Sequence, residues 1–426
     1  MDSMDIISSL PDPILCHILS FLPNHFSAKT SVLARRWRYL WNYVRDRRFN
    51  DLEYYKFNHN CQPFSDMVDN VLSLHNGSID SLIIRSDDVA SQCQIDAWIS
   101  TAIARNVQVL RLCDFSDVTL TQCRFKCNSL IELTLQNFTI SAKPGDVCLP
   151  RLKKLHLRYN CYENDESLPN LVSGCLAIED LFVERKLCDN MGCCYVSSPT
   201  LKSFVLWSKF HCYMLECHYE HKVVLDIPAV QYLDIKDKYS RTILSEKLSS
   251  MVVAKSFLSY DHDSEANIRH WRNLSQLVER LSNAKSQTFR SCTMMEHLNP
   301  TFSFATTRFH NLIKVELEAD WYFLTELLES AYKLEYLTVR EVNEVNCWRE
   351  PKNIPECLLS TLKYVSISGF AGGEHELNMV SYIMMHAKVL KSVRIDTKSR
   401  CRRKDIHSKL VSYLPRGSHE CRLTFI

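Results

Sequence analysis

One six-residue pattern, apolar-x-x-apolar-x-apolar, recurs along most of this chain and constrains its fold more than any other feature. The eleven copies begin at Ile79, Val107, Leu130, Leu152, Ile178, Leu201, Val230, Leu312, Leu334, Leu362 and Leu390. Consecutive copies start 22 to 29 residues apart, except across one gap between Val230 and Leu312. A short unit repeated at this interval predicts an array of stacked units.

Each copy predicts one short strand. The last two apolar positions alternate, so they point to the same face of the strand, and the first apolar position fills the same core. One unit cannot bury this face alone, so neighbouring units stack and their strands form a parallel sheet. The spacing is typical of leucine-rich repeats. The sequence therefore predicts an α/β solenoid with parallel strands on its concave face and helices outside.

Helical patterns lie between several of the predicted strands. Apolar residues at helical spacing precede two of them, at Ile95, Trp98, Ile99, Ala102 and Ile103, and at Phe323, Leu324, Leu327, Leu328 and Ala331. Another pattern, from Ile268 to Leu281, lies in the gap and predicts a degenerate repeat with an enlarged helix.

The asparagine ladder that is usual in such repeats is mostly missing. Asn160 stands three residues after the last apolar position of its copy, whereas Phe115, Phe138, Asp320 and Phe370 occupy the equivalent places elsewhere. We therefore expect an irregular solenoid.

The first 49 residues carry a different, helical pattern. Asp12 and Pro13 favour a helix start, and Pro23 favours its end. A second helix is predicted from Ala28 to about Val32, and a third presents one apolar face, made of Leu33, Trp37, Leu40, Trp41 and Val44. About 45 residues are too few to bury all this apolar surface. The module either caps the repeats or offers apolar surface to another protein.

Two segments resemble known plant domains. Residues 7–23 and 30–41, with Leu-Pro-Asp at 10–12 and Arg-Trp-x-x-Leu-Trp at 36–41, resemble the F-box of plant F-box proteins, departing from it at Pro13 and Ala34. Residues 354–373, 388–391 and 414–421 are similar to the FBD region that follows leucine-rich repeats in one plant F-box family. The resemblance implies an F-box at residues 1–49, a leucine-rich-repeat solenoid at 50–346, and an FBD region at 351–426 that continues the solenoid.

The resemblance also implies a function. The family's F-box binds an Skp-type adaptor and through it a cullin, while the repeats hold a protein target for ubiquitination. The chain would then be the non-catalytic substrate-recognition subunit of an SCF-type (Skp–cullin–F-box) ubiquitin ligase, without a cofactor. By position, adaptor binding falls on twelve residues: Leu10, Pro11, Ile14, Leu15, Ile18, Leu19, Leu22, Val32, Leu33, Trp37, Leu40 and Trp41.

Large aliphatic and tryptophan side chains are typical of interface hot spots. We therefore expect Leu15→Ala or Trp41→Ala to weaken adaptor binding, although some of the twelve residues will form the core of the module. The target is expected on the concave strand face. Its predicted outward residues are mixed in charge, namely Glu132, Thr134, Lys154, His156, Ser203, Glu316, Glu335 and Thr338.

Motifs for catalysis are missing from the sequence. It contains no phosphate-binding glycine loop and no G-x-S-x-G, and the pair His375-Glu376 lacks the second histidine of a zinc protease because position 379 is Met379. The best zinc candidate is the group His211, Cys212, Cys217, His218 and His221, and a weaker one is Cys188, Cys193 and Cys194; both are more simply explained as polar loops. The basic run at Lys398, Arg400, Arg402, Arg403 and Lys404 is a nuclear import signal, a phosphate-binding patch or simply a solvated surface.

Composition bears on the compartment. No stretch approaches the ~18 apolar residues of a membrane span, and the acidic start does not fit a signal peptide. An odd number of cysteines, 19, favours thiols in a reducing cytoplasm or nucleus, and a net charge of +2 argues against a dedicated nucleic-acid binder. Two alternative functions remain open: an F-box receptor gated by a small ligand, and a non-ligase repeat scaffold.

Overall fold

The chain folds into two compact units, residues Met1–Leu201 and Lys202–Ile426. The computed structural model describes residues 7, 9–22, 24–57, 62–75, 77–87, 90–115, 118–120, 125–186, 188–208, 221–237, 240–244, 248–258, 275–291, 307–318, 322–340, 348–397 and 417–426.

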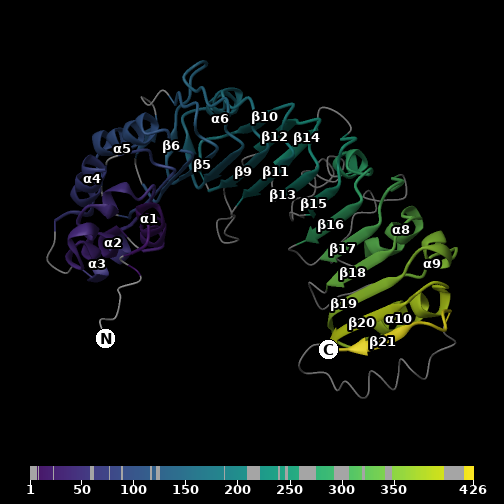
Figure 1. Cartoon of the computed structure of the whole chain (residues 1–426). Coiled ribbons are helices and arrows are strands. Elements are labelled where there is room, and N and C mark those ends of the chain that lie inside the picture. The colour runs from purple at the N-terminus through teal and green to yellow at the C-terminus, as the bar shows by residue number, and fades with distance from the viewer. Residues whose placement is uncertain are drawn as a thin grey trace, which may run out of the picture. The chain divides into compact units, whose positions relative to one another are not determined.

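The first unit begins with a small helical module, purple in Figure 1. Its elements are α1 (Asp12–Ser20), α2 (Asn24–Lys29) and three 3-10 helices, η1 (Thr30–Val32), η2 (Arg35–Arg38) and η3 (Leu40–Tyr43). The N-cap of α1 is Pro11 instead of the expected Asp12, and Asp12 contributes a negative charge to the first turn. The continuous third helix predicted from Leu33 to Val44 is wrong. Ala34 has an extended backbone, which separates η1 from η2.

Parallel strands follow the module within the first unit. In sheet order they are β1 (Asp46–Asn50), β2 (Ser81–Arg85), β3 (Val109–Cys113), β5 (Glu132–Gln136), β7 (Lys154–Arg158) and β9 (Asp180–Arg185). Each pairs with the next in register, so Leu82 lies beside Leu110 and Leu110 beside Leu133. The remaining elements are α3 (Asp51–Phe57), α4 (Phe64–Leu74), α5 (Gln92–Ala104), α6 (Ser167–Ser173), β4 (Thr119–Leu120), β6 (Thr139–Ile140), β8 (Cys161–Tyr162) and β10 (Cys193–Ser197).

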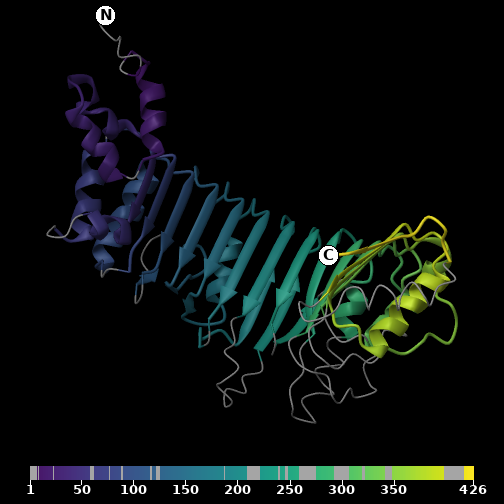
Figure 2. The same ribbon diagram turned by 90° about the horizontal axis from the view of Figure 1, so that it is seen from below.

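The second unit repeats this design. Its main strands are β11 (Ser203–Ser208), β13 (Tyr232–Lys236), β15 (Val253–Leu258), β16 (Ser286–Ser291), β17 (Lys314–Glu318), β18 (Tyr336–Arg340), β19 (Tyr364–Phe370), β20 (Ser392–Thr397) and β21 (Arg422–Phe425). The first of them, in teal, lie side by side in Figure 2. Strands β12 (His221–Asp226) and β14 (Ser240–Leu244) pair in parallel outside this row of main strands. Helices α8 (Tyr322–Ser330), α9 (Glu356–Ser360) and α10 (Glu374–His386) cover one face of the later strands, and no helix of the described residues covers the other, open face (Figure 1).

The structure confirms the predicted fold class. All eleven copies of the pattern form strands, and the two apolar side chains that each copy was predicted to turn inward are buried. The helices predicted before Val107 and Leu334 are α5 and α8. Among the described residues, the gap holds two further strands of the main sheet, β15 and β16, instead of a single degenerate repeat. Residues 275–280 of the helix predicted there are helical, and 268–274 lie outside the described residues.

Asn160 joins neighbouring repeats as an asparagine ladder would. Its buried side chain donates to the carbonyl of Leu135 at 3.0 Å and accepts from the backbone N–H of Phe138 at 2.8 Å. Where asparagine is missing, Phe115 and Phe138 pack together with ring centroids 5.5 Å apart. Aromatic packing therefore replaces part of the ladder in the first unit.

Candidate functional site

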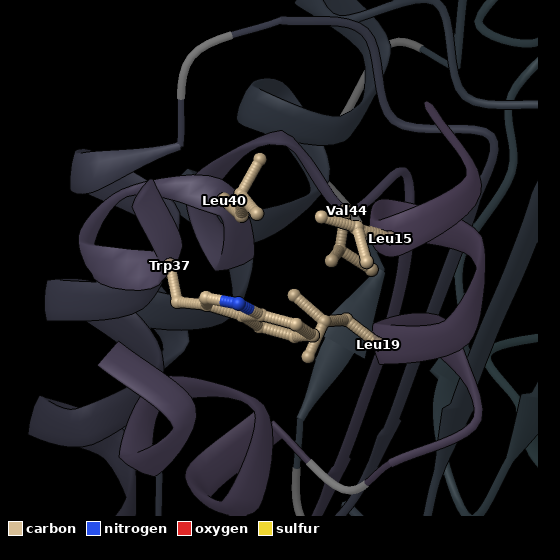
Figure 3. Close-up of a cluster of buried hydrophobic side chains, with 5 residues drawn as sticks. All are labelled: Leu15, Leu19, Trp37, Leu40 and Val44. Carbon is tan, nitrogen blue, oxygen red and sulfur yellow. The ribbon is translucent and has the colours of Figure 1, made fainter. Parts of the chain in front are cut away.

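The helical module has a core of its own. Leu15 and Leu19 of α1 pack against Trp37, Leu40 and Val44, and these five side chains face one another in Figure 3. Leu15 is 0% exposed and Trp37 only 5%. Four of the twelve predicted adaptor contacts, Leu15, Leu19, Trp37 and Leu40, are therefore core residues. Two more, Leu10 and Trp41, are partly buried against this cluster.

Polar contacts fix the helices of the module to one another. Arg36 of η2 forms an ion pair with Asp12 of α1, with 2.5 Å between Nη2 and Oδ1. The Cys16 thiol lies 3.5 Å from the carbonyl of Leu40, to which it donates. Burial, and then the nearby charge of Asp12, raise the pKa of the Cys16 thiol, so the neutral donor is favoured.

The other six predicted contacts are exposed. Ile14 and Ile18 lie one helical turn apart on α1, and Leu22 follows the helix. Val32 and Leu33, at the end of η1, are 86% and 68% exposed, and Pro11 is also exposed. Scattered exposed apolar residues are ordinary, but this many in one small module are typical of interaction surfaces.

Sequence reasoning missed four large exposed side chains in the same module. Phe21 is 73% exposed, and Ile7, Tyr39 and Tyr43 are also exposed. Their size and apolar character were visible in the sequence. They lie off the regular helical stripe, so the periodicity that selected the twelve residues passed over them.

A buried arginine attaches the module to the first repeats. Arg47 of β1 is 0% exposed, and its Nη2 donates to the carbonyl of Trp41 at 2.7 Å and to Nδ1 of His75 at 2.9 Å. Its guanidinium also lies 5.8 Å from the centre of the Trp41 ring. Among the described residues, Nε and Nη1 of Arg47 have no hydrogen-bond partner.

Among the described residues, no carboxylate acts on the charge of Arg47 or His75 to offset burial. Burial lowers the pKa of Arg47 to about 10. Burial, followed by the charge of Arg47, lowers the pKa of His75 to about 4. His75 is therefore neutral at physiological pH and accepts at Nδ1, while Nε2, 3.2 Å from the carbonyl of Ser78, is the donor. The same strand, β1, is also held by α2, since Asn24 donates to the carbonyl of Arg48 at 2.7 Å.

The outward strand faces, where the target is expected, carry paired charges. The three predicted acidic residues there all have a basic partner, in the ion pairs Arg111–Glu132, Arg340–Glu316 and Lys363–Glu335. His156 packs edge-on against Phe182, and burial lowers its pKa. Thr134 is buried, whereas Lys154 is exposed.

The competing sites gain no support from the described residues. Within these residues no group of three His, Cys, Asp or Glu could hold a metal ion, and four members of the first zinc candidate, His211, Cys212, Cys217 and His218, lie outside them, as does the whole basic run. The buried carboxylate of Glu376 accepts from the backbone N–H groups of Ala371 and Gly373, which is a helix-capping role. In the described part of the chain, no helix is long and apolar enough to cross a bilayer.

One cavity lies in the first unit. It is lined by inward side chains, among them Leu120, Phe125 and Leu135, and its volume is about 20 Å³, enough for one water molecule. It therefore gives no support to a receptor gated by a small ligand.

Family profiles match three parts of the chain. The F-box domain profile matches residues 7–49, the profile described as "FBD-associated F-box protein At5g56370, LRR repeats" matches 95–250, and the FBD profile matches 350–395.

Relatives that match nearly the whole chain are named for the F-box and the leucine-rich repeats, and two of the three below also for the FBD region. F-box/FBD/LRR-repeat protein At5g56420 of Arabidopsis thaliana is 29% identical, over 99% of this chain and 99% of that protein. F-box/FBD/LRR-repeat protein At2g04230 of the same plant is 30% identical, over 93% of this chain and 90% of that protein. F-box/LRR-repeat protein 13, also from this plant, is 28% identical, over 92% of this chain and 90% of that protein.

Proposed function

Since this chain belongs to the plant F-box/FBD/leucine-rich-repeat family, we propose that it is the substrate-recognition subunit of an SCF-type ubiquitin ligase. Proteins of this family are generally non-catalytic adaptors, the F-box implies an Skp-type partner, and the repeats imply protein binding. The finer proposal is that the module at residues 1–49 binds the Skp-type adaptor, and through it a cullin, while the open strand faces bind the target.

The observation that carries this proposal is the division of the module into a closed core and an apolar surface. The core is complete without a partner, because Trp37 is already covered by residues of the module. The exposed residues Ile14, Ile18, Leu22, Val32 and Leu33 contribute nothing to that core. We therefore assign direct adaptor contact to these five and to Pro11. Leu15, Leu19, Trp37 and Leu40 act by keeping the module folded.

This assignment changes the choice of test variant. Leu15→Ala would weaken binding by destabilising the module, because truncating a fully buried leucine costs about 2–5 kcal/mol. Loss of binding in that variant would not distinguish contact from unfolding. Val32→Asp combined with Leu33→Asp is a cleaner test, since both side chains are exposed and their replacement leaves no cavity.

We propose to measure the affinity of the full chain for a purified plant Skp-type adaptor by titration calorimetry. The Val32→Asp/Leu33→Asp variant is expected to bind at least tenfold more weakly while melting at the wild-type temperature. Leu52→Asp is the matched control, because Leu52 is 65% exposed on α3, outside the module, and its variant should bind normally. If the wild-type chain does not bind the adaptor, the module is a cap and the protein is a non-ligase scaffold.

A further inference from the structure

A row of five outward side chains crosses the last strands of the second unit. Strand register places Lys314 beside Tyr336, Tyr336 beside Tyr364, Tyr364 beside Ser392, and Ser392 beside Arg422. The rings of Tyr336 and Tyr364 are stacked, with centroids 4.9 Å apart and planes 12° apart. Both tyrosines remain exposed, at 41% and 37%. We call these five residues the tyrosine row.

The tyrosine row carries an excess of positive charge. Lys314 and Arg422 at its ends are exposed, and neither has an acidic partner among the described residues. Arg394, at the next outward position of β20, is a third exposed cation without one.

The acidic residues nearby are mostly neutralised. Arg340 lies 2.6 Å from Glu316 and 3.6 Å from Glu318, and Lys363 lies 2.9 Å from Glu335. Asp396, one outward position beyond Arg394 on β20, has no basic partner among the described residues, and Glu420, two residues before Arg422, is also exposed. The ends of the row therefore have positive charge to offer to a ligand.

We propose that the tyrosine row binds an extended segment of the target protein that is rich in aspartate and glutamate, an inference that rests on the proposed function. Adjacent strands are about 4.8 Å apart, so the four intervals from β17 to β21 span about 19 Å. An extended segment of about six residues covers this length. Its carboxylates face Lys314 and Arg422 at the two ends and the tyrosine hydroxyls between them.

The arrangement favours several carboxylates over one phosphate group, because the cations are spread across the row and do not converge on a point. It also favours a peptide over a nucleic acid. Tyr336 and Tyr364 each use one ring face on the other, which removes stacking surface for bases.

The test uses the full chain and a fluorescent ten-residue peptide of alternating glutamate and alanine, followed by anisotropy at low salt. We expect this peptide to bind at least tenfold more tightly than its glutamine counterpart. Lys314→Glu combined with Arg422→Glu should weaken binding about tenfold, because two attractions become repulsions. Tyr336→Ala combined with Tyr364→Ala should also weaken it. Lys388→Glu, an exposed lysine on the turn before β20, is the matched control and should bind normally.

Four results would overturn this inference: equal binding of the glutamine peptide, no effect of the double charge reversal, tighter binding of a peptide whose only anionic group is one phosphoserine, or tighter binding of a ten-nucleotide RNA. Adaptor affinity of the same variants separates the two proposals. A tyrosine-row variant that loses the peptide but keeps the adaptor supports this inference. A wild-type chain that binds the adaptor but not the glutamate peptide refutes this inference and leaves the proposed function standing.

Discussion

Acid should loosen the attachment of the helical module to the first repeats through His75. In the folded chain the pKa of His75 is about 4, against an ordinary value near 6.5 in the unfolded chain. Between these two values the unfolded state binds more protons than the folded state, so the free energy of unfolding falls as pH falls. The full effect is about 3 kcal/mol, and at pH 5 about 2 kcal/mol of it is already lost.

The physical cause is that Arg47 and a protonated His75 would both be hydrogen-bond donors in the same contact. Neutral His75 accepts from Arg47 at Nδ1, 2.9 Å away. Protonation would place a proton on that nitrogen and a second positive charge beside the buried guanidinium. His75→Gln keeps an acceptor near Arg47 but does not titrate. Its stability should therefore depend less on pH, by about 2 kcal/mol between pH 8 and pH 5.

Urea denaturation followed by tryptophan fluorescence reports on this region, because Trp41 lies against Arg47. Wild-type and His75→Gln chains would be compared at pH 8, 6.5 and 5, so that carboxylates common to both cancel. A histidine titration by NMR gives the pKa of His75 directly. Identical pH dependence in the two chains, or a His75 pKa above 6, would refute this reasoning.

Three further substitutions test the packing of the first unit by thermal or chemical denaturation. Asn160→Ala should cost about 1–3 kcal/mol, because it leaves two buried backbone groups without their partner. Gly174→Ala should cost about 1–3 kcal/mol, because the new Cβ would overlap the carbonyl of Val147. Asp189→Ala should cost about 3–5 kcal/mol, since it leaves the buried guanidinium of Arg185 without the carboxylate 2.7 Å away. Wild-type stability in any of these variants would contradict the contact named for it.

The eleven strands that sequence reasoning found differ in their inward residues from three that it missed, β1, β15 and β16. The eleven found strands place two large apolar side chains inward. Strand β1 places Arg47 inward beside Phe49, β15 places Ala254 and Ser256 inward, and β16 places Gln287 beside Phe289. Gln287 is stabilised by donating to the carbonyl of Leu281 at 2.7 Å, a partner that the pattern cannot reveal. A search for apolar residues misses a strand whose inward polar residues are hydrogen-bonded to other parts of the chain.

The sequence predicted which residues belong to the candidate site, but not which of them are exposed on its surface. Periodicity placed Leu15 and Ile14 on one broad stripe, yet Leu15 is fully buried and Ile14 exposed. The difference depends on where the chain turns after α1 and after η1. Ala34 has an extended backbone, whereas the prediction from helical spacing assumed that one helix continues through this residue. This break leaves Leu33 exposed and brings Trp37 into the core.

The register of the parallel strands allows the outward residues to change in evolution while the inward residues stay the same. Inward residues such as Leu337 and Val365 lie beside each other in the core, while their sequence neighbours Tyr336 and Tyr364 lie beside each other on the open face. Neighbouring positions in the sequence are therefore constrained differently, one by packing in the core and the other by recognition of a target. A duplicated gene can exchange the second set and acquire a new target while inheriting an intact scaffold.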